Sequence, residues 1–261
     1  MTSYEFILAA QPLKSTGATI AISLVIPAYN EEKYITPTLE SVGRAKTKYE
    51  RATGKSVEVV VVDNASADRT AEIARSFGCT VIPFDKHQMS AVRNAGAATA
   101  RGEYIAFVDA DRSIVHEDLF LEIDANLSNP RIFGGGTRFR PEKSSLNILI
   151  AVTLVRLFCW VLRTGCMLYY LRRSDFDDMG GWNEQMYAAE DVDMSLRMKK
   201  AAKASGRKLR NLRGRLTFCV RKFHMLPAWR TLRDFLRLVR RWDFSKPDEV
   251  ARFYYDVDNL R

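Results

Sequence analysis

The sequence has few of the residues that crosslink a chain or span a membrane. It holds four cysteines in 261 residues, and none forms a Cys-x-x-Cys pair or a zinc-type cluster with a histidine. We therefore expect free thiols in a reducing compartment. No run reaches the roughly 18 apolar residues that a spanning helix needs, because Arg156 interrupts the longest candidate, 146–162. The first residues also lack the basic segment of a signal peptide. We expect a cytoplasmic protein, either soluble or peripheral at the inner face of the membrane.

Charge is unevenly distributed along the chain. Hydrophobic residues make up 47% and charged residues 27%, which is ordinary for a globular protein. The net charge is +9, yet residues 197–241 alone hold sixteen Lys or Arg and a single acid. Such a segment suits an anionic membrane, a lipid-linked acceptor or an acidic glycan, and it equally suits a solvated basic face. Because no nucleic-acid reader motif is present, we expect no nucleic acid as a partner.

Patterns typical of buried strands and of helices alternate along the first half of the chain. Continuous apolar runs with β-branched residues predict strands, and the segments between them predict helices. This alternation predicts right-handed crossovers and a mostly parallel, Rossmann-like sheet flanked by helices. The predicted strands are 20–26, 57–62, 80–84, 104–108, 166–171 and one or two within 209–220; the predicted helices are 36–49, 67–77, 89–101, 145–163, 189–204 and 228–241.

Polar and acidic residues follow three of the predicted strands, in segments 27–31, 63–66 and 109–111. Ligands of such sheets bind at the carboxyl ends of the strands, so these groups should gather at one edge. The carboxylates of Asp109 and Asp111 would repel a diphosphate unless Mg²⁺ or Mn²⁺ lay between them. An Asp-x-Asp by itself is a weak signal and is better explained as an acidic turn that caps the following segment.

Five motifs in order make the chain resemble the family-two inverting glycosyltransferases, which have the GT-A fold. The resemblance implies metal-dependent transfer of a sugar from a nucleotide-diphosphate-sugar, a UDP-sugar being favoured, to a hydroxyl of a glycan or a lipid-linked acceptor. It also implies an α/β GT-A domain with a nucleotide-binding half and an acceptor-binding half. The motifs are Ser23–Glu32, Val60–Thr70, Arg93–Gly96, Gly102–Asp111, and Gly180–Glu184 followed by Glu190–Arg197. We expect an N-terminal extension at 1–18, the domain at 19–225 with halves 19–112 and 113–225, and a basic helical extension at 226–261.

The resemblance assigns the donor side residue by residue. Asp63 would hydrogen-bond the base, since a carboxylate suits the imide N–H of uracil or the amino edge of guanine. Asp111 would be the principal ligand of Mn²⁺ or Mg²⁺, and Asp109 would contact the ribose or the metal. Pro27, Tyr29 and Glu31 would line the nucleotide pocket, and Arg93 would lie near the base or diphosphate. Alternatively, Pro27 and Tyr29 shape a turn, Asp63 caps the helix near Ala67, and Arg93 is a solvated helix residue.

The acceptor side rests on the last motif. Asp191 maps to the base that takes the proton of the acceptor hydroxyl, and Glu190 is either the alternative base or an acceptor ligand. All three acids at this helix start, Asp193 included, would also be favoured there by the helix dipole. Gly181 would permit a close approach of the backbone, and Trp182 would stack on a sugar or belong to the core. A late histidine, His224, is a further candidate metal ligand.

Two other classes of protein share some of these features. A nucleotidyltransferase would usually carry a Gly-rich, basic phosphate loop after the first strand, where this chain has Pro27–Glu31. A non-catalytic nucleotide-sugar or membrane-binding module would be expected to have lost one of Asp109, Asp111 and Asp191. The sequence therefore favours the glycosyltransferase.

Overall fold

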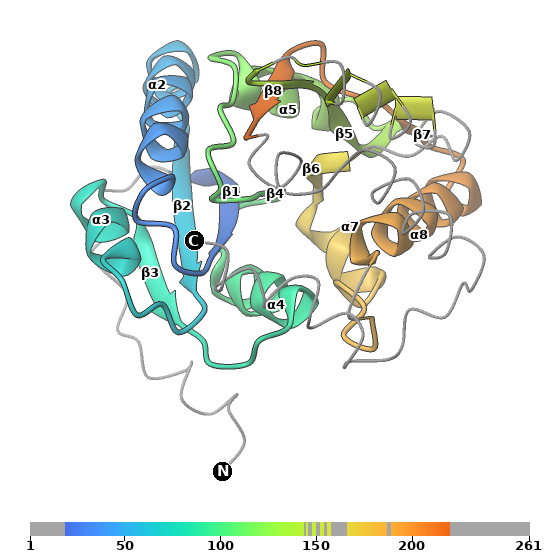
Figure 1. Cartoon of the computed structure of the whole chain (residues 1–261). Helices are drawn as coiled ribbons and strands as arrows, with labels where there is room; N and C mark the ends of the chain where they lie inside the picture. The colour runs from blue at the N-terminus through green and yellow to red at the C-terminus, as the bar shows by residue number, and fades with distance from the viewer. Residues whose placement is uncertain are drawn as a thin grey trace.

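The computed structural model describes residues 19–143, 145, 148–149, 152–153, 156–157, 166–186 and 189–219. Eight strands in this part of the chain form one sheet in the order β3-β2-β1-β4-β6-β5-β7, with β8 beside β5. Helices cover both faces of the sheet (Figure 1). The predicted extensions at 1–18 and 226–261, the predicted helix 228–241 and His224 lie outside the described residues.

The first half of the sheet is parallel, as the alternation predicts. Its strands are β1 (Ile20–Ala28), β2 (Ser56–Asp63), β3 (Thr80–Pro83) and β4 (Tyr104–Val108), and they all pair in parallel. The helices between them are α2 (Ile35–Thr53), α3 (Thr70–Ser76) and α4 (Met89–Thr99). The carboxyl ends of β1, β2 and β4 therefore meet at one edge.

Several boundaries in this half differ from the prediction by one to four residues, and two of them have a clear physical reason. Strand β1 continues through Pro27, because its ladder with β4 ends at Val25 and a proline is tolerated where a ladder hydrogen bond is not required. Helix α3 begins at Thr70 rather than Ala67, because the residues before it bond to the loop after β1.

The second half of the sheet is mixed. Strand β6 (Cys166–Arg172) is antiparallel to both β4 and β5 (Ile132–Pro141), so β5 runs parallel to β4. Short strands β7 (Lys208–Leu209) and β8 (Arg215–Phe218) pair in parallel with β5. The remaining helices are α5 (Leu119–Leu127), α7 (Arg173–Asp178) and α8 (Glu190–Ala204). The predicted boundary between residues 112 and 113 falls in the loop after β4 and stays a prediction.

The sequence pattern did not predict β5, whose run Gly134-Gly135-Gly136 resembles a loop. A Cβ at Gly134 would lie 2.4 Å from the carbonyl oxygen of Tyr170, and one at Gly135 would lie 1.8 Å from that of Arg210. The glycines therefore let this strand lie close to its neighbours. Strand propensity alone predicts a loop for the same residues, because glycine is unfavourable in strands.

Two hydrophobic clusters separate the sheet from its helices. Side chains of α2, α3 and α5 pack on one face, around Leu24 and Ile26 of β1. Side chains of α4, α7 and α8 pack on the other face, around Val25 and Phe107. Alternate residues of β1 thus serve opposite clusters, which explains why its apolar run is continuous.

Within the segment predicted as a helix at 145–163, the described residues 148–149, 152–153 and 156–157 are helical. Ile148 and Val152 are buried in the first cluster, whereas Leu149 and Leu157 are exposed. No helix in the described part of the chain is both long and apolar enough to cross a membrane.

Candidate active site

The loops after β1 and β2 are bound to each other at the carboxyl edge of the sheet. The Asn30 backbone N–H donates to Ser66 Oγ at 3.0 Å, and the Ala67 N–H donates to Asn30 Oδ1 at 2.8 Å. The Glu31 N–H donates to Thr70 Oγ1 at 2.7 Å. These bonds make the two motif loops one rigid unit. Asn30, Ser66 and Thr70 hold the loops together, a role that the motifs alone did not predict.

The predicted nucleotide-pocket residues lie on this unit. Pro27 and Glu31 are buried, and Tyr29 is partly exposed and meets the ring of His87 edge-on at 5.2 Å. The Asp63 carboxylate accepts the Ser66 N–H at 3.3 Å. Asp63 lies well before α3 and does not cap it, so that alternative is wrong.

Four non-glycine residues with positive φ flank the candidate site: Asn30 at 49°, Ala65 at 56°, Arg112 at 60° and Ala189 at 56°. The first three lie in the loops after β1, β2 and β4, and Ala189 lies directly before α8. Positive φ is unfavourable for residues with a Cβ, and such strain is concentrated at functional sites. The strain therefore coincides with the edge that the motifs mark.

Arg93 brings the motifs together. The residue is 4% exposed, and its guanidinium donates to Asp109 Oδ1 at 2.9 Å and to Glu190 Oε1 at 3.1 Å. Asp191 Oδ1 lies 3.7 Å from the same guanidinium. The alternative that Arg93 is a solvated helix residue is therefore wrong, because Arg93 joins the loop after β4 to the start of α8.

The charges at this centre are unbalanced. Burial opposes the charged form of Arg93, but the carboxylates of Asp109, Asp191 and Glu190 outweigh burial and raise its pKa above the usual value. One cation thus faces three carboxylates. The surplus of negative charge lies where a cation or a proton can be taken up.

Glu190 and Asp191 differ in exposure although they are neighbours at the first turn of α8. The Glu190 side chain is 9% exposed and is held by Arg93, whereas the Asp191 side chain is 37% exposed. The Tyr169 hydroxyl fixes this turn by donating to the Asp191 backbone carbonyl at 2.9 Å. Of the two acids, Asp191 is the one that an incoming molecule can reach.

The Arg93–Gly96 motif joins three parts of the site. Arg93 binds the acids, and Asn94 holds the turn after α7 by accepting the Trp182 N–H at 2.8 Å and donating to its carbonyl at 2.9 Å. Gly96 lets α4 lie against β1, since a Cβ there would come 2.3 Å from Val25 Cγ1. The role of Asn94 was not predicted from the sequence.

Trp182 belongs to the core and does not stack on a sugar. Its side chain is 1% exposed and meets Phe107 and Tyr169 edge-on at 5.3 and 5.5 Å. The Arg93 guanidinium lies over its ring at 4.5 Å, a cation–π contact. The prediction of Trp182 as a sugar-facing residue is corrected: it supports the arginine from beneath.

Gly181 shapes the turn that follows α7, where its φ is 68° and a Cβ would lie 2.8 Å from Asn94 Oδ1. Arg197 clamps this turn by donating to the carbonyls of Met179 at 3.1 Å and Gly181 at 2.7 Å. Asp193 in turn holds Arg197 at 2.6 Å. Asp193 is therefore more than an acid favoured by the helix dipole.

The oxygen atoms near Asp111 suit a divalent cation that prefers oxygen ligands. Asp109 is half-exposed, Asp111 is partly exposed, and the Ser113 hydroxyl donates to Asp111 at 3.4 Å. Among the described residues no group of three or more His, Cys, Asp or Glu could hold a metal. Two carboxylates suit Mg²⁺ or Mn²⁺, which commonly complete their shell with water and phosphate oxygens, and not a structural zinc site.

Comparison with known proteins agrees with this geometry. Residues 23–149 match the model of glycosyl transferase family 2. EpsH of Bacillus subtilis, named as a glycosyltransferase, is 37% identical over 98 residues, which cover 36% of this chain and 26% of EpsH. The glycosyltransferase AglE of Haloferax volcanii is 39% identical over 101 residues, covering 35% and 31%. The match thus spans less than half the length of these relatives.

Two solved structures share the fold. The mannosyltransferase PcManGT of Pyrobaculum calidifontis superposes with a TM-score of 0.61 at 19% identity, covering 96% of this chain and 75% of that one. Residues 1–349 of TarS from Staphylococcus aureus give 0.58 at 19% identity, covering 92% and 71%. The fold is therefore GT-A, as predicted. Over residues 23–149 the chain is similar to glycosyl transferase family 2.

Proposed function

We propose that this protein is a metal-dependent, inverting glycosyltransferase that moves a sugar from a nucleotide-diphosphate-sugar to a hydroxyl of a glycan or lipid-linked acceptor. The observation that carries the proposal is the Arg93 centre. It joins Asp109 of the donor edge to Glu190 and Asp191 of α8 within hydrogen-bond or ion-pair distance. A donor-binding edge and a reachable carboxylate base thus lie in contact.

The nucleotide would bind on the joined loops after β1 and β2. Pro27, Tyr29 and Glu31 would form the pocket, and the Asp63 carboxylate would accept the imide N–H of uracil. The TarS and PcManGT structures include complexes with UDP-GlcNAc and with GDP-Man. A UDP-sugar is favoured here because a single carboxylate suits the single imide donor of uracil.

Asp111, together with Asp109, would hold the divalent cation, Mn²⁺ or Mg²⁺. The PcManGT complex contains Mn²⁺, and the two carboxylates here fit the same chemistry. When bound, the ion supplies positive charge against the departing diphosphate. Arg93 would orient Asp109 and limit the repulsion between the acids and the donor.

Asp191 would accept the proton of the acceptor hydroxyl while that oxygen attacks the sugar carbon from the face opposite the diphosphate. Its place in the first turn of α8 favours the ionised form. Glu190, which is buried against Arg93, would position rather than react. We further propose that the protein works in the cytoplasm, with peripheral contact to anionic membrane.

A thermal-shift screen tests this function. The protein is melted with UDP, GDP, ADP and CDP, each in Mn²⁺ and in excess chelator. We expect UDP with Mn²⁺ to give the largest rise, and the chelator to abolish it. Stabilisation by no nucleotide would overturn the proposal, and stabilisation unchanged by chelator would overturn the metal assignment. A response to GDP in place of UDP would correct the donor.

A further inference from the structure

A strip of exposed arginines lies on the two strands beside the metal-binding loop. Arg138 and Arg140 of β5 and Arg215 of β8 are exposed. Their neighbours in the strands, Phe139 and Leu216, are buried in the first cluster. Because successive side chains of a strand point to opposite faces, the three arginines share the outer face of this small sheet.

The strip lies at the same edge as the candidate active site. Gly136 of β5 pairs with Tyr169, and Tyr169 pairs with Phe107 near the end of β4. Since β5 runs parallel to β4, residues 138–140 extend past the end of β4 toward the level of the Asp109–Asp111 loop. Thr217 of β8 also exchanges two backbone hydrogen bonds, of 2.8 and 2.9 Å, with Ile114, just beyond that loop.

The electrostatics of the strip are unfavourable without a ligand. Arg138 pairs in register with Arg215, and like charges opposite one another in a sheet destabilise it. No carboxylate of the described residues forms an ion pair with any of the three, and the nearby Glu142 is bound to Arg112 at 3.3 Å. The Arg140 guanidinium is fixed by its bond to Thr217 Oγ1 at 2.9 Å. A multiply charged anion would relieve this repulsion.

Resting on the proposed function, we infer that Arg138, Arg140 and Arg215 bind phosphate or carboxylate groups of an anionic acceptor chain. Guanidinium forks suit such groups because they form paired hydrogen bonds with them. The donor diphosphate is provided for elsewhere, at the ends of β1, β2 and β4. An acceptor chain lying along β5 and β8 would pass the loop that carries Asp111.

The surroundings favour a hydrophilic polyanion over a membrane surface. Peripheral membrane sites combine cations with exposed apolar side chains. The large apolar side chains between these arginines, Phe139, Leu216 and Phe218, are all buried. The exposed Leu149 and Leu157 belong to the segment that packs on the other face, since Arg156 of that segment lies over the Phe139 ring.

Inorganic polyphosphate is the probe for the test, with neutral dextran for comparison, both titrated in excess chelator. The double variant Arg138→Gln/Arg215→Gln should bind polyphosphate at least about tenfold more weakly than the wild type. The control Arg75→Gln/Arg131→Gln removes the same charge from exposed arginines elsewhere and should bind as the wild type does. Arg138→Lys/Arg215→Lys should fall between, because lysine keeps the charge without the fork.

Two further readouts separate the possible failures. The Gln double variant should keep an unreduced melting temperature and the wild-type thermal shift with UDP and Mn²⁺. If neither the wild type nor any variant is stabilised by UDP, the proposed function fails. The polyphosphate titration still tests whether the three arginines bind an anion. An equal loss of polyphosphate affinity in the control Arg75→Gln/Arg131→Gln would show that binding depends only on the overall charge, and it would overturn the inference. The Gln double variant could instead bind polyphosphate normally but bind more weakly to vesicles of phosphatidylcholine and phosphatidylglycerol in equal parts. That result would assign the three arginines to a membrane surface.

Discussion

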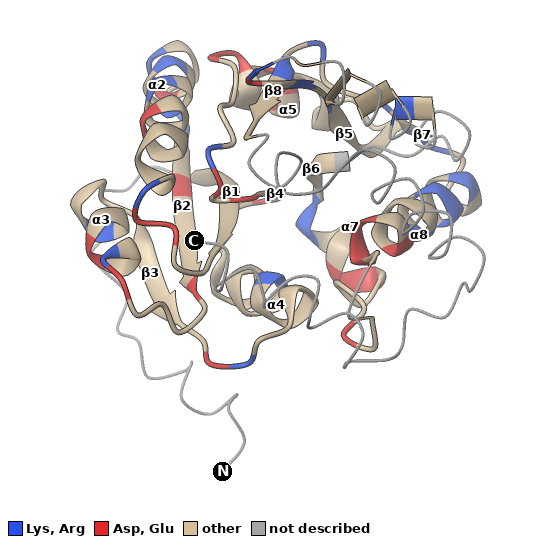
Figure 2. Ribbon diagram, viewed as in Figure 1, with Lys and Arg blue, Asp and Glu red and all other residues tan. Residues whose placement is uncertain are grey.

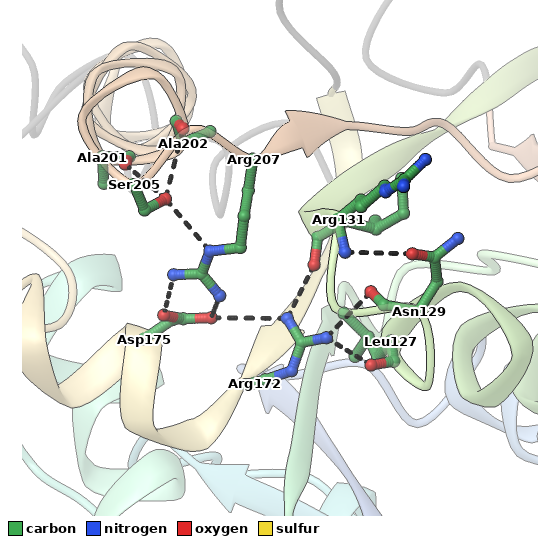
Figure 3. A network of polar contacts seen from close by, with 10 residues as sticks. Leu127, Asn129, Arg131, Arg172, Asp175, Ala201, Ala202, Ser205 and Arg207 are labelled. Carbon is green, nitrogen blue, oxygen red and sulfur yellow. Dashed lines mark hydrogen bonds and ion pairs between the residues drawn. The ribbon is translucent and has the colours of Figure 1, made fainter.

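Two buried arginine networks in this molecule have opposite charge ratios. At the sheet edge, Arg93 faces three carboxylates, those of Asp109, Glu190 and Asp191. At the opposite edge of the sheet, where Arg172 pairs with Tyr104 at the start of β4, the Asp175 carboxylate accepts paired hydrogen bonds from Arg207, at 2.6 and 2.8 Å, and lies 3.7 Å from Arg172 (Figure 3). One network has surplus acid, and the other has surplus cation.

The guanidinium groups of the second network are also held by uncharged groups. Arg172 also donates to the carbonyls of Ile132 and Leu127, and Arg207 lies over the Phe133 ring at 4.6 Å. It ties α7 and the segment after α8 to β5 and to the loop before β5, and it thereby holds the C-terminal end of α8. The Arg93 network fixes the near end and still has an acid, Asp191, that is partly exposed. In Figure 2 acidic residues lie along the loop after β4 and at the start of α8.

The largest expected effect is on catalysis at the acid-rich network. Asp191→Asn should lower donor hydrolysis and transfer roughly a hundred- to ten-thousand-fold, because the proton acceptor is lost. UDP binding and the melting temperature should stay near wild type. The measurement is release of UDP from a UDP-sugar in Mn²⁺. Asp177→Asn, at a 60% exposed carboxylate, is the matched control, and normal turnover by Asp191→Asn would mean that another group is the base.

The next effect is on stability and follows from the charge ratio. Asp175→Asn leaves two buried or half-buried cations without their acid and should cost about 3 kcal/mol of unfolding free energy. Glu190→Gln leaves Arg93 with two acids and should cost about 1 kcal/mol. Urea denaturation of both variants measures the difference. Equal costs would show that the two networks do not differ in the way the geometry indicates.

The sequence predicts the local elements of this site but not the contacts between distant residues. The four parallel strands and the meeting of their acidic loops follow from apolar runs and turn signals. The contact of Arg93 with Glu190 does not, because it joins residues 97 apart through packing of α4 and α8 on one face. Nor does the burial of Trp182, since a Gly-Gly-Trp turn reads equally well as a surface feature.

A smaller effect on catalysis is expected at Arg197, which holds the turn after α7. Arg197→Gln frees the carbonyls of Met179 and Gly181 and should lower kcat about tenfold, because the turn that sets Arg93 and α8 loosens. The KM for the donor should change little, and unfolding should lose about 1–2 kcal/mol. Lys203→Gln, in the last turn of α8, is the control. A variant that loses stability but keeps kcat would make Arg197 purely structural.

The Arg93 centre as a site for metal and nucleotide diphosphate is tested most directly by titration calorimetry of UDP. The titration uses the wild type and Asp111→Asn, each in Mn²⁺ and in excess chelator. We predict binding by the wild type in Mn²⁺ that is lost in chelator and weakened at least about tenfold in Asp111→Asn. UDP binding of equal affinity in all four titrations, or none in any, would contradict the account.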